Sequence, residues 1–94
     1  MKWSLNYNKC MDSKQAYEKA KQSITAETIE KFKVKADVSY EDDNQQFKAK
    51  GKGFDLCANF GETKVDIELN LSFLLKPVGN KVKAILEKEF TKVI

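Results

Sequence analysis

Side chains that could do chemistry are few in this chain, and their spacing favours no catalytic or metal-binding arrangement. The sequence has no histidine, so the usual general base and the commonest metal ligand are both missing. The two cysteines, Cys10 and Cys57, stand too far apart in the sequence to indicate a zinc site or a disulfide framework. Gly51 and Gly53 lack the third glycine and the following helix of a phosphate-binding loop. We therefore predict no enzyme, no catalytic residue, no bound metal and no cofactor.

The charged residues predict a solvated surface. Asp42, Asp43 and Asn44 could attract a cation, but no EF-hand spacing follows them, so an acidic turn is the better interpretation. The net charge is +3, and every basic residue is a lysine interleaved with Asp and Glu. Because bidentate recognition of guanine and phosphate relies heavily on arginine, we expect no nucleic-acid partner.

The elements that would position any site are organised around the stretch Val65–Phe73. Apolar and polar residues alternate strictly along it, which predicts a strand with one buried and one wet face. Pro77 then fits the first turn of a helix that we predict over Pro77–Ile94. The predicted buried stripe of that helix is Val78, Val82, Ile85, Leu86, Phe90 and Ile94.

The N-terminal third predicts a strand followed by a helix. Lys2–Asn8 alternates, with Trp3 on the core face. Asp12 and Gln15 resemble a capping box at the start of the helix. Its buried residues fall at helical spacing, and we expect either a kink near Thr25 or a second short helical turn to about residue 31. The predicted buried residues are Ala16, Tyr17, Ala20 and Ile24.

Four strands in a meander follow, beginning with Phe32–Glu41, which carries Val34 and Val38 on one face and Lys33 and Lys35 on the other. A turn at Asp43-Asn44 would set Tyr40 opposite Phe47. A turn centred on Gly51-Lys52 would set Ala49 opposite Phe54 and Lys48 opposite Asp55. For the last hairpin we favour a four-residue turn, Gly61–Lys64, which pairs Phe60 with Val65 and Leu56 with Leu69. The shorter turn would oppose Asp55 and Glu68.

These elements predict a single α+β domain over residues 1–94, of order β-α-β-β-β-β-α. We expect a five-stranded antiparallel sheet with the meander 2-3-4-5 and both helices on one face, resembling a shortened helix-grip. Strand one is placed at an edge beside strand five, with the edge beside strand two as the alternative. No apolar run is long enough to span a bilayer, and the N-terminus lacks the h-region of a signal peptide, so we expect a cytoplasmic protein.

From Phe47 to the C-terminus the chain resembles the small family called putative polyhydroxyalkanoic acid system proteins. The resemblance rests on the glycine-bearing turn Phe47–Phe54 and on Leu71–Pro77, a strand-to-helix corner, followed by Val82, Ile85 and Leu86. The N-terminal half agrees in outline. The family often has His where Lys9 or Cys10 stands here, and often Gly at the position of Ser72.

The resemblance implies a link to polyhydroxyalkanoate metabolism or granules, without a catalytic residue. It favours a small accessory interaction module that contacts a granule surface or a partner protein. Contact with a polymer requires an exposed apolar patch, for which we nominate Trp3, Phe73, Leu74 and Leu75, with at least one of the two leucines exposed. Two alternatives stay open: a helix-grip-type domain that binds a small hydrophobic ligand, and a homodimer paired through an edge strand.

Overall fold

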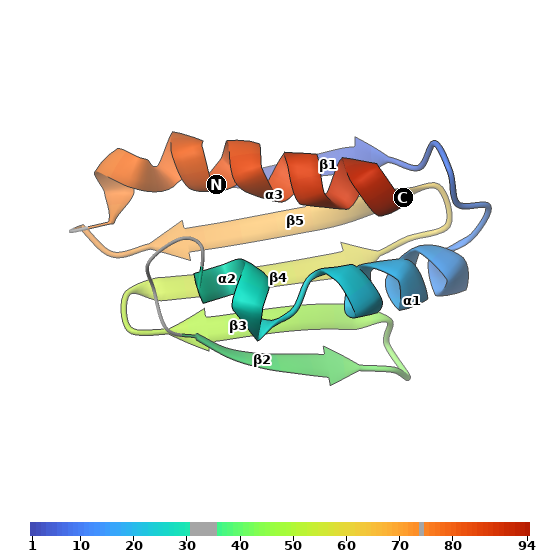
Figure 1. Ribbon diagram of the computed structural model, residues 1–94, viewed down its shortest axis with the longest axis horizontal. Helices are drawn as coiled ribbons and strands as arrows, with labels where there is room; N and C mark the ends of the chain where they lie inside the picture. The colour runs from blue at the N-terminus through green and yellow to red at the C-terminus, as the bar shows by residue number, and fades with distance from the viewer. Residues whose placement is uncertain (31–35, 74) are drawn as a thin grey trace.

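The computed structural model describes residues 1–30, 36–73 and 75–94 and shows an α+β domain built on one antiparallel sheet (Figure 1). The sheet has five strands in the order β1-β5-β4-β3-β2. The prediction of a meander with strand one beside strand five is therefore confirmed. In chain order the elements are β1 (Lys2–Asn6), α1 (Ser13–Ser23), α2 (Ala26–Glu30), β2 (Ala36–Glu41), β3 (Gln46–Gly51), β4 (Phe54–Phe60), β5 (Lys64–Leu71), the 3₁₀ turn η1 (Lys76–Val78) and α3 (Gly79–Val93).

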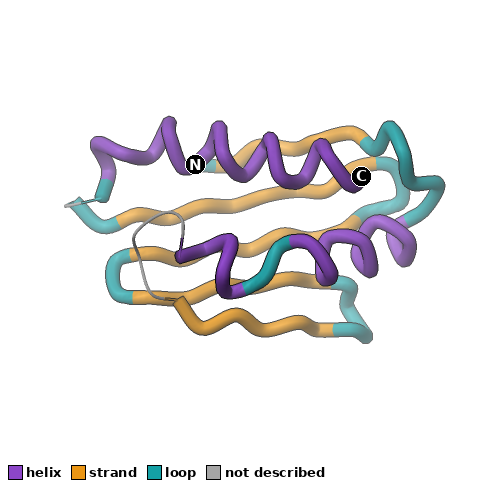
Figure 2. The backbone as a smooth tube through the Cα atoms, in the orientation of Figure 1, coloured by secondary structure: helices purple, strands orange, loops and turns teal. Residues whose placement is uncertain are grey.

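The helices lie on one face of the sheet. Figures 1 and 2 show α3 running along β1 and β5, while α1 and α2 cross the other half of the sheet. No helix among the described residues covers the opposite face, which we call the open face. The core lies between the two layers and is formed by Ala16, Tyr17, Ala20, Ile24, Phe47, Ala49, Phe54, Leu56, Ala58, Phe60, Val65, Ile67, Leu69, Val82, Leu86, Phe90 and Ile94.

The first helical segment begins and divides as the sequence predicts. The Asp12 carboxylate accepts a hydrogen bond from the Gln15 backbone N–H at 2.8 Å, and the Gln15 side chain accepts one from the Met11 N–H at 2.8 Å. These two hydrogen bonds satisfy backbone N–H groups at the start of the helix, which have no carbonyl partner within the helix itself. After Ile24 the chain starts a second short helix, α2, as one of the two alternatives predicted. The predicted strand residues from Phe32 to Lys35 lie outside the described residues.

Two of the three hairpin registers were predicted correctly. Tyr40 lies opposite Phe47, and Phe60 lies opposite Val65. The middle hairpin was predicted wrongly: Ala49 lies opposite Leu56 and Lys48 opposite Cys57, a shift of two residues. The turn is Lys52-Gly53 because Gly53 adopts a φ of +76°, which a glycine tolerates and other residues resist. A two-residue shift keeps every side chain on its predicted face.

Strand β5 ends earlier than predicted. It stops at Leu71, so Phe73 does not continue the buried row and is 85% exposed. Strand β1 likewise stops at Asn6 instead of Asn8. The final helix begins at Gly79, two residues after the predicted start, and Val78 in the preceding 3₁₀ turn is 41% exposed. Val82, Leu86, Phe90 and Ile94 form the buried stripe as predicted.

The far end of α3 is held against the loop after β1. The Ile94 carbonyl oxygen accepts hydrogen bonds from three successive backbone N–H groups, those of Asn8, Lys9 and Cys10, at 2.6–2.9 Å. The Cys10 thiol also donates to the Val93 carbonyl at 3.3 Å. These contacts tie the C-terminal end of α3 to the loop that follows β1.

Candidate functional site

An apolar surface lies where β5 turns into α3. We call it the corner patch and define it as Met1, Leu71, Phe73 and Val78. Phe73 is 85% exposed, Met1 47% and Val78 41%, while Leu71 is half-buried. Together with Met11, which is on the loop before α1, these three are the large apolar side chains most exposed among the described residues.

A tight turn holds Phe73 out of the core. The Ser72 carbonyl accepts hydrogen bonds from the Leu75 and Lys76 N–H groups, both at 3.0 Å. The Ser72 N–H in turn donates to the Gly53 carbonyl at 2.8 Å, which anchors the corner to the β3–β4 turn. The strand ends at Leu71. The alternation that points Ile67, Leu69 and Leu71 toward the helices therefore does not continue to Phe73, whose side chain is exposed.

Met1 joins the corner patch by backbone pairing and by packing. Its amino group donates to the Leu69 carbonyl at 2.7 Å, and its carbonyl accepts from the Leu69 N–H at 2.8 Å. A Cβ added at Gly79 would lie 2.7 Å from Met1 Cε and 3.3 Å from Leu71 Cδ1. The glycine at the start of α3, a mild weakness by helix propensity alone, therefore allows Met1 and Leu71 to lie close to the helix backbone.

A hollow of about 570 Å³ adjoins this packing. It is open to solvent, and it is lined by three apolar and two polar residues, Met1, Leu69, Leu71, Asn70 and Lys76. A volume of this size is within the range of roughly 300–1,000 Å³ that small-molecule sites occupy.

The four predicted patch residues divide between exposed and covered positions. Phe73 is exposed as the hypothesis requires. Leu75 is half-buried and packs against the core, and Leu74 lies outside the described residues. Trp3 is half-buried on the helical face of β1, where the Lys83 ammonium lies 5.3 Å from its ring centroid. Its indole N–H is buried and has no hydrogen-bond partner.

Met1 and Val78 were missed as patch residues. Met1 continues the odd-numbered row of Trp3, Leu5 and Tyr7, so the strand alternation could have indicated that it shares their face. Val78 precedes Val82 by four residues, which favoured a place on the buried stripe. No sequence signal distinguished a 3₁₀ turn from the first turn of the α-helix.

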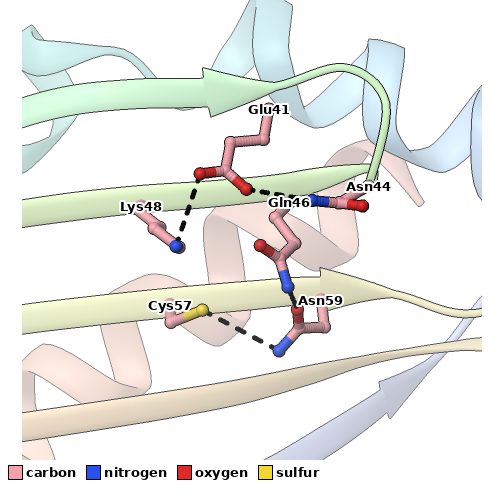
Figure 3. Close-up of polar contacts among 6 residues, drawn as sticks. All are labelled: Glu41, Asn44, Gln46, Lys48, Cys57 and Asn59. Carbon is pink, nitrogen blue, oxygen red and sulfur yellow. Dashed lines mark hydrogen bonds and ion pairs between the residues drawn. The ribbon is translucent and has the colours of Figure 1, made fainter.

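The open face is polar and carries side-chain networks, as Figure 3 shows for strands β2–β4. The Lys48 ammonium lies 3.4 Å from the Glu41 carboxylate, and the side-chain amide of Gln46 donates to that of Asn59. Cys57 faces this side, as predicted, and accepts a weak hydrogen bond from the Asn59 amide at 3.8 Å. Burial raises the pKa of the Cys57 thiol. A thiol of this kind is a poor nucleophile, because the thiolate is the reactive form.

A second polar cluster braces α1 against the β2–β3 turn. The Asp42 carboxylate accepts hydrogen bonds from the Tyr17 hydroxyl at 2.5 Å and from the Lys21 ammonium at 2.9 Å. The Tyr17 hydroxyl and then Lys21 lower the pKa of Asp42. Lys21 also lies 5.5 Å from the ring centroid of Tyr40, whose hydroxyl donates to the Ile24 carbonyl. Each group has its partner within the chain, so the cluster serves packing.

Metal-ligating side chains do not gather in threes anywhere in the part of the chain that the structure describes. Its helices, over the same described residues, include none that is long and apolar enough to cross a bilayer. The corner patch with its adjoining hollow is the candidate site, because it combines exposed apolar side chains with a cavity of ligand size.

The comparisons with known proteins place the chain in a family. A family model described as putative polyhydroxyalkanoic acid system protein matches residues 9–94, which includes all of the corner patch except Met1. No curated protein matches the chain, and no solved structure does.

Proposed function

Because the chain belongs to the family of putative polyhydroxyalkanoic acid system proteins, we propose that it is a small, non-catalytic, cytoplasmic accessory protein that binds the surface of polyhydroxyalkanoate granules through the corner patch. The observation that supports this most directly is the 85% exposure of Phe73 at the turn between β5 and α3. The description of the matched family names polyhydroxyalkanoic acid as the polymer. The corner patch is an apolar surface of the kind that such a polymer would contact.

Binding to a granule would remove the exposed apolar side chains of the corner patch from water. A phenylalanine side chain transferred from water to an apolar environment gains about 1.5–3 kcal/mol. Met1 and Val78 are partly exposed as well, and each adds to this gain where it also meets the apolar surface. The turn fixed by Ser72 keeps Phe73 outside before binding, so docking requires no rearrangement of the core.

The test compares two equally exposed apolar residues in different places. Phe73→Ser should abolish retention on isolated polyhydroxyalkanoate granules, while its melting temperature stays close to that of the wild type, because no packed cavity is created. Met11→Ser is the matched control: Met11 is 90% exposed but lies on the loop before α1. It should bind granules as the wild type does.

Equal retention of both variants and the wild type would refute the proposal. Equal loss in both variants would mean that binding follows total exposed apolar area and not the corner patch.

A second candidate, a binding site for a small hydrophobic ligand, is favoured by the corner hollow, whose lining includes Leu69, Leu71 and Lys76. An acyl chain could lie against the two leucines with its carboxylate near Lys76. Titration calorimetry with a soluble medium-chain fatty acid tests this. Heat that disappears in Lys76→Ala and in Leu71→Ser, but persists in Phe73→Ser, would assign the hollow to ligand binding.

A further inference from the structure

The positive charge of this chain is concentrated in one element. The turn η1 and helix α3, over residues 76–94, contain five lysines and two glutamates, a balance of +3. Residues 1–75 contain twelve lysines and twelve Asp or Glu residues, so they are neutral as a set. The net charge of +3 is therefore carried by η1 and α3 alone, and an anion that approaches this helix meets a positive field.

Three of these lysines lie on the side of α3 that faces away from the sheet, along which the helix runs in Figure 1. The buried stripe of the helix is Gly79, Val82, Leu86 and Phe90. Exposed residues recur at steps of three or four on the opposite side, and they include Lys81, Ala84, Lys88, Thr91 and Lys92. We call Lys81, Lys88 and Lys92 the lysine stripe. At about 1.5 Å per residue it extends roughly 16 Å along the helix.

The carboxylates of the helix leave most of the lysine stripe unpaired. Glu87 lies 3.9 Å from Lys83, which is outside the stripe. Glu89 lies 3.6 Å from Lys92. Among the described residues, no carboxylate is within ion-pair distance of the other two stripe lysines. Two ammonium groups of the stripe therefore have no acidic partner in that part of the chain.

Helix stability does not account for the lysine stripe. A lysine in the last turn interacts favourably with the negative end of a helix, which explains Lys92. Lys81 is in the first turn, where the positive end favours acidic residues, yet that turn contains none. Lys9 adds a further ammonium beside the stripe, since it donates to the Lys92 carbonyl at 2.7 Å. With Lys88 and Lys92 it lines an open depression, together with Glu87, which already has its own lysine partner.

We propose that the outer side of α3 binds an anionic lipid surface, with the lysine stripe and Lys9 among the headgroup phosphates. A straight stripe on one side of a helix lets a flat surface reach every lysine at once. Lysine acts as a point charge on a flexible stem and needs no fixed geometry, which suits a surface of many mobile headgroups. Carboxylates of a partner protein are recognised best by the planar fork of arginine, and this chain contains no arginine.

The binding is expected to be electrostatic and sensitive to salt. The apolar side of α3 is buried in the core, so it is not free to enter the lipid as the apolar face of an interfacial helix does. Attraction of lysines to an anionic surface falls off within a Debye length, which shrinks from about 30 Å at 0.01 M salt to about 3 Å at 1 M. The interaction involves no residue of the corner patch and is measured without polymer, so its failure and the failure of granule binding are distinguishable.

The test compares two variants of equal net charge by co-sedimentation with lipid vesicles. The stripe variant combines Lys81→Gln, Lys88→Gln and Lys92→Gln. The control variant combines Lys50→Gln, Lys52→Gln and Lys64→Gln, three exposed lysines of the sheet strands and the β3–β4 turn. The vesicles contain equal parts of phosphatidylglycerol and phosphatidylcholine, or phosphatidylcholine alone. Because all six positions are exposed, circular dichroism should show both variants folded as the wild type is.

At low salt the wild type should bind the anionic vesicles and not the neutral ones, and 1 M salt should release it. The stripe variant should bind at least about tenfold more weakly than the wild type, while the control variant should stay close to it. A wild type that does not prefer anionic vesicles would overturn the proposal. Equal loss in the two variants would also overturn it, because binding would then follow net charge and not α3. So would binding of the wild type to polyglutamate in place of vesicles, which would indicate an acidic protein partner.

Discussion

Replacing Leu69 by alanine tests the facing of β5, on which the core and the corner patch both depend. Leu69 is 1% exposed and lies opposite Leu56, which is fully buried. Three carbon atoms leave the core, and at about 0.8 kcal/mol for each buried methylene the lost transfer energy is roughly 2.4 kcal/mol. Hydrogen-bonded strands flank the site on both sides, so the backbone can collapse little and a cavity penalty adds to this loss. We expect a destabilisation of about 3–4 kcal/mol.

The assay is urea unfolding followed by circular dichroism, with a thermal melt beside it. For a domain of this size, 3 kcal/mol corresponds to a fall in melting temperature of about 12–24 °C. Glu68→Ala is the control, one residue away and facing the open side, where its carboxylate meets the Asn70 amide at 3.3 Å and Lys2 at 4.0 Å. It should cost no more than about 0.5 kcal/mol. Equal costs for the two substitutions would refute the facing of β5.

Two further predictions concern the polar brace and the middle turn. The Tyr17 hydroxyl and the Lys21 ammonium lower the pKa of Asp42 from 3.8, so the ionised carboxylate stabilises the fold above that pH, and this stabilisation is lost as the pH falls through the lowered pKa. The difference in melting temperature between the wild type and Asp42→Asn should therefore become smaller in acid. A difference that does not change with pH would contradict the role of Asp42 in this cluster. Gly53→Ala should lower the free energy of unfolding in urea by about 2 kcal/mol, because alanine resists the positive φ and its Cβ would lie 2.6 Å from Ser72 Oγ. Adding Ser72→Gly should recover part of that loss. If nothing is recovered, the clash between the alanine Cβ and the Ser72 side chain contributes nothing to it.

The order of the four meander strands could be predicted because each local signal there agrees with the global arrangement, whereas placing β1 beside β5 rested on the likeness to a helix-grip sheet, with the other edge as the alternative. The alternation in Lys2–Asn6 and Lys64–Leu71 assigns one face of each strand to the core. The opposition of Asp55 and Glu68 rules out the shorter final turn. The middle hairpin could not be settled in this way. Gly51 and Gly53 both permit a turn, and the two registers bury the same side chains, so neither burial nor charge distinguishes them.

The corner patch was only half predictable, because its exposure depends on where a strand ends. Alternation alone extends the buried row from Leu71 to Phe73, and only the hydrogen bonds to the Ser72 carbonyl end that row. The contact of Met1 with Gly79 joins residues from the two ends of the sequence. Local periodicity carries no information about such a contact, so Met1 had no signal beyond its odd-numbered place.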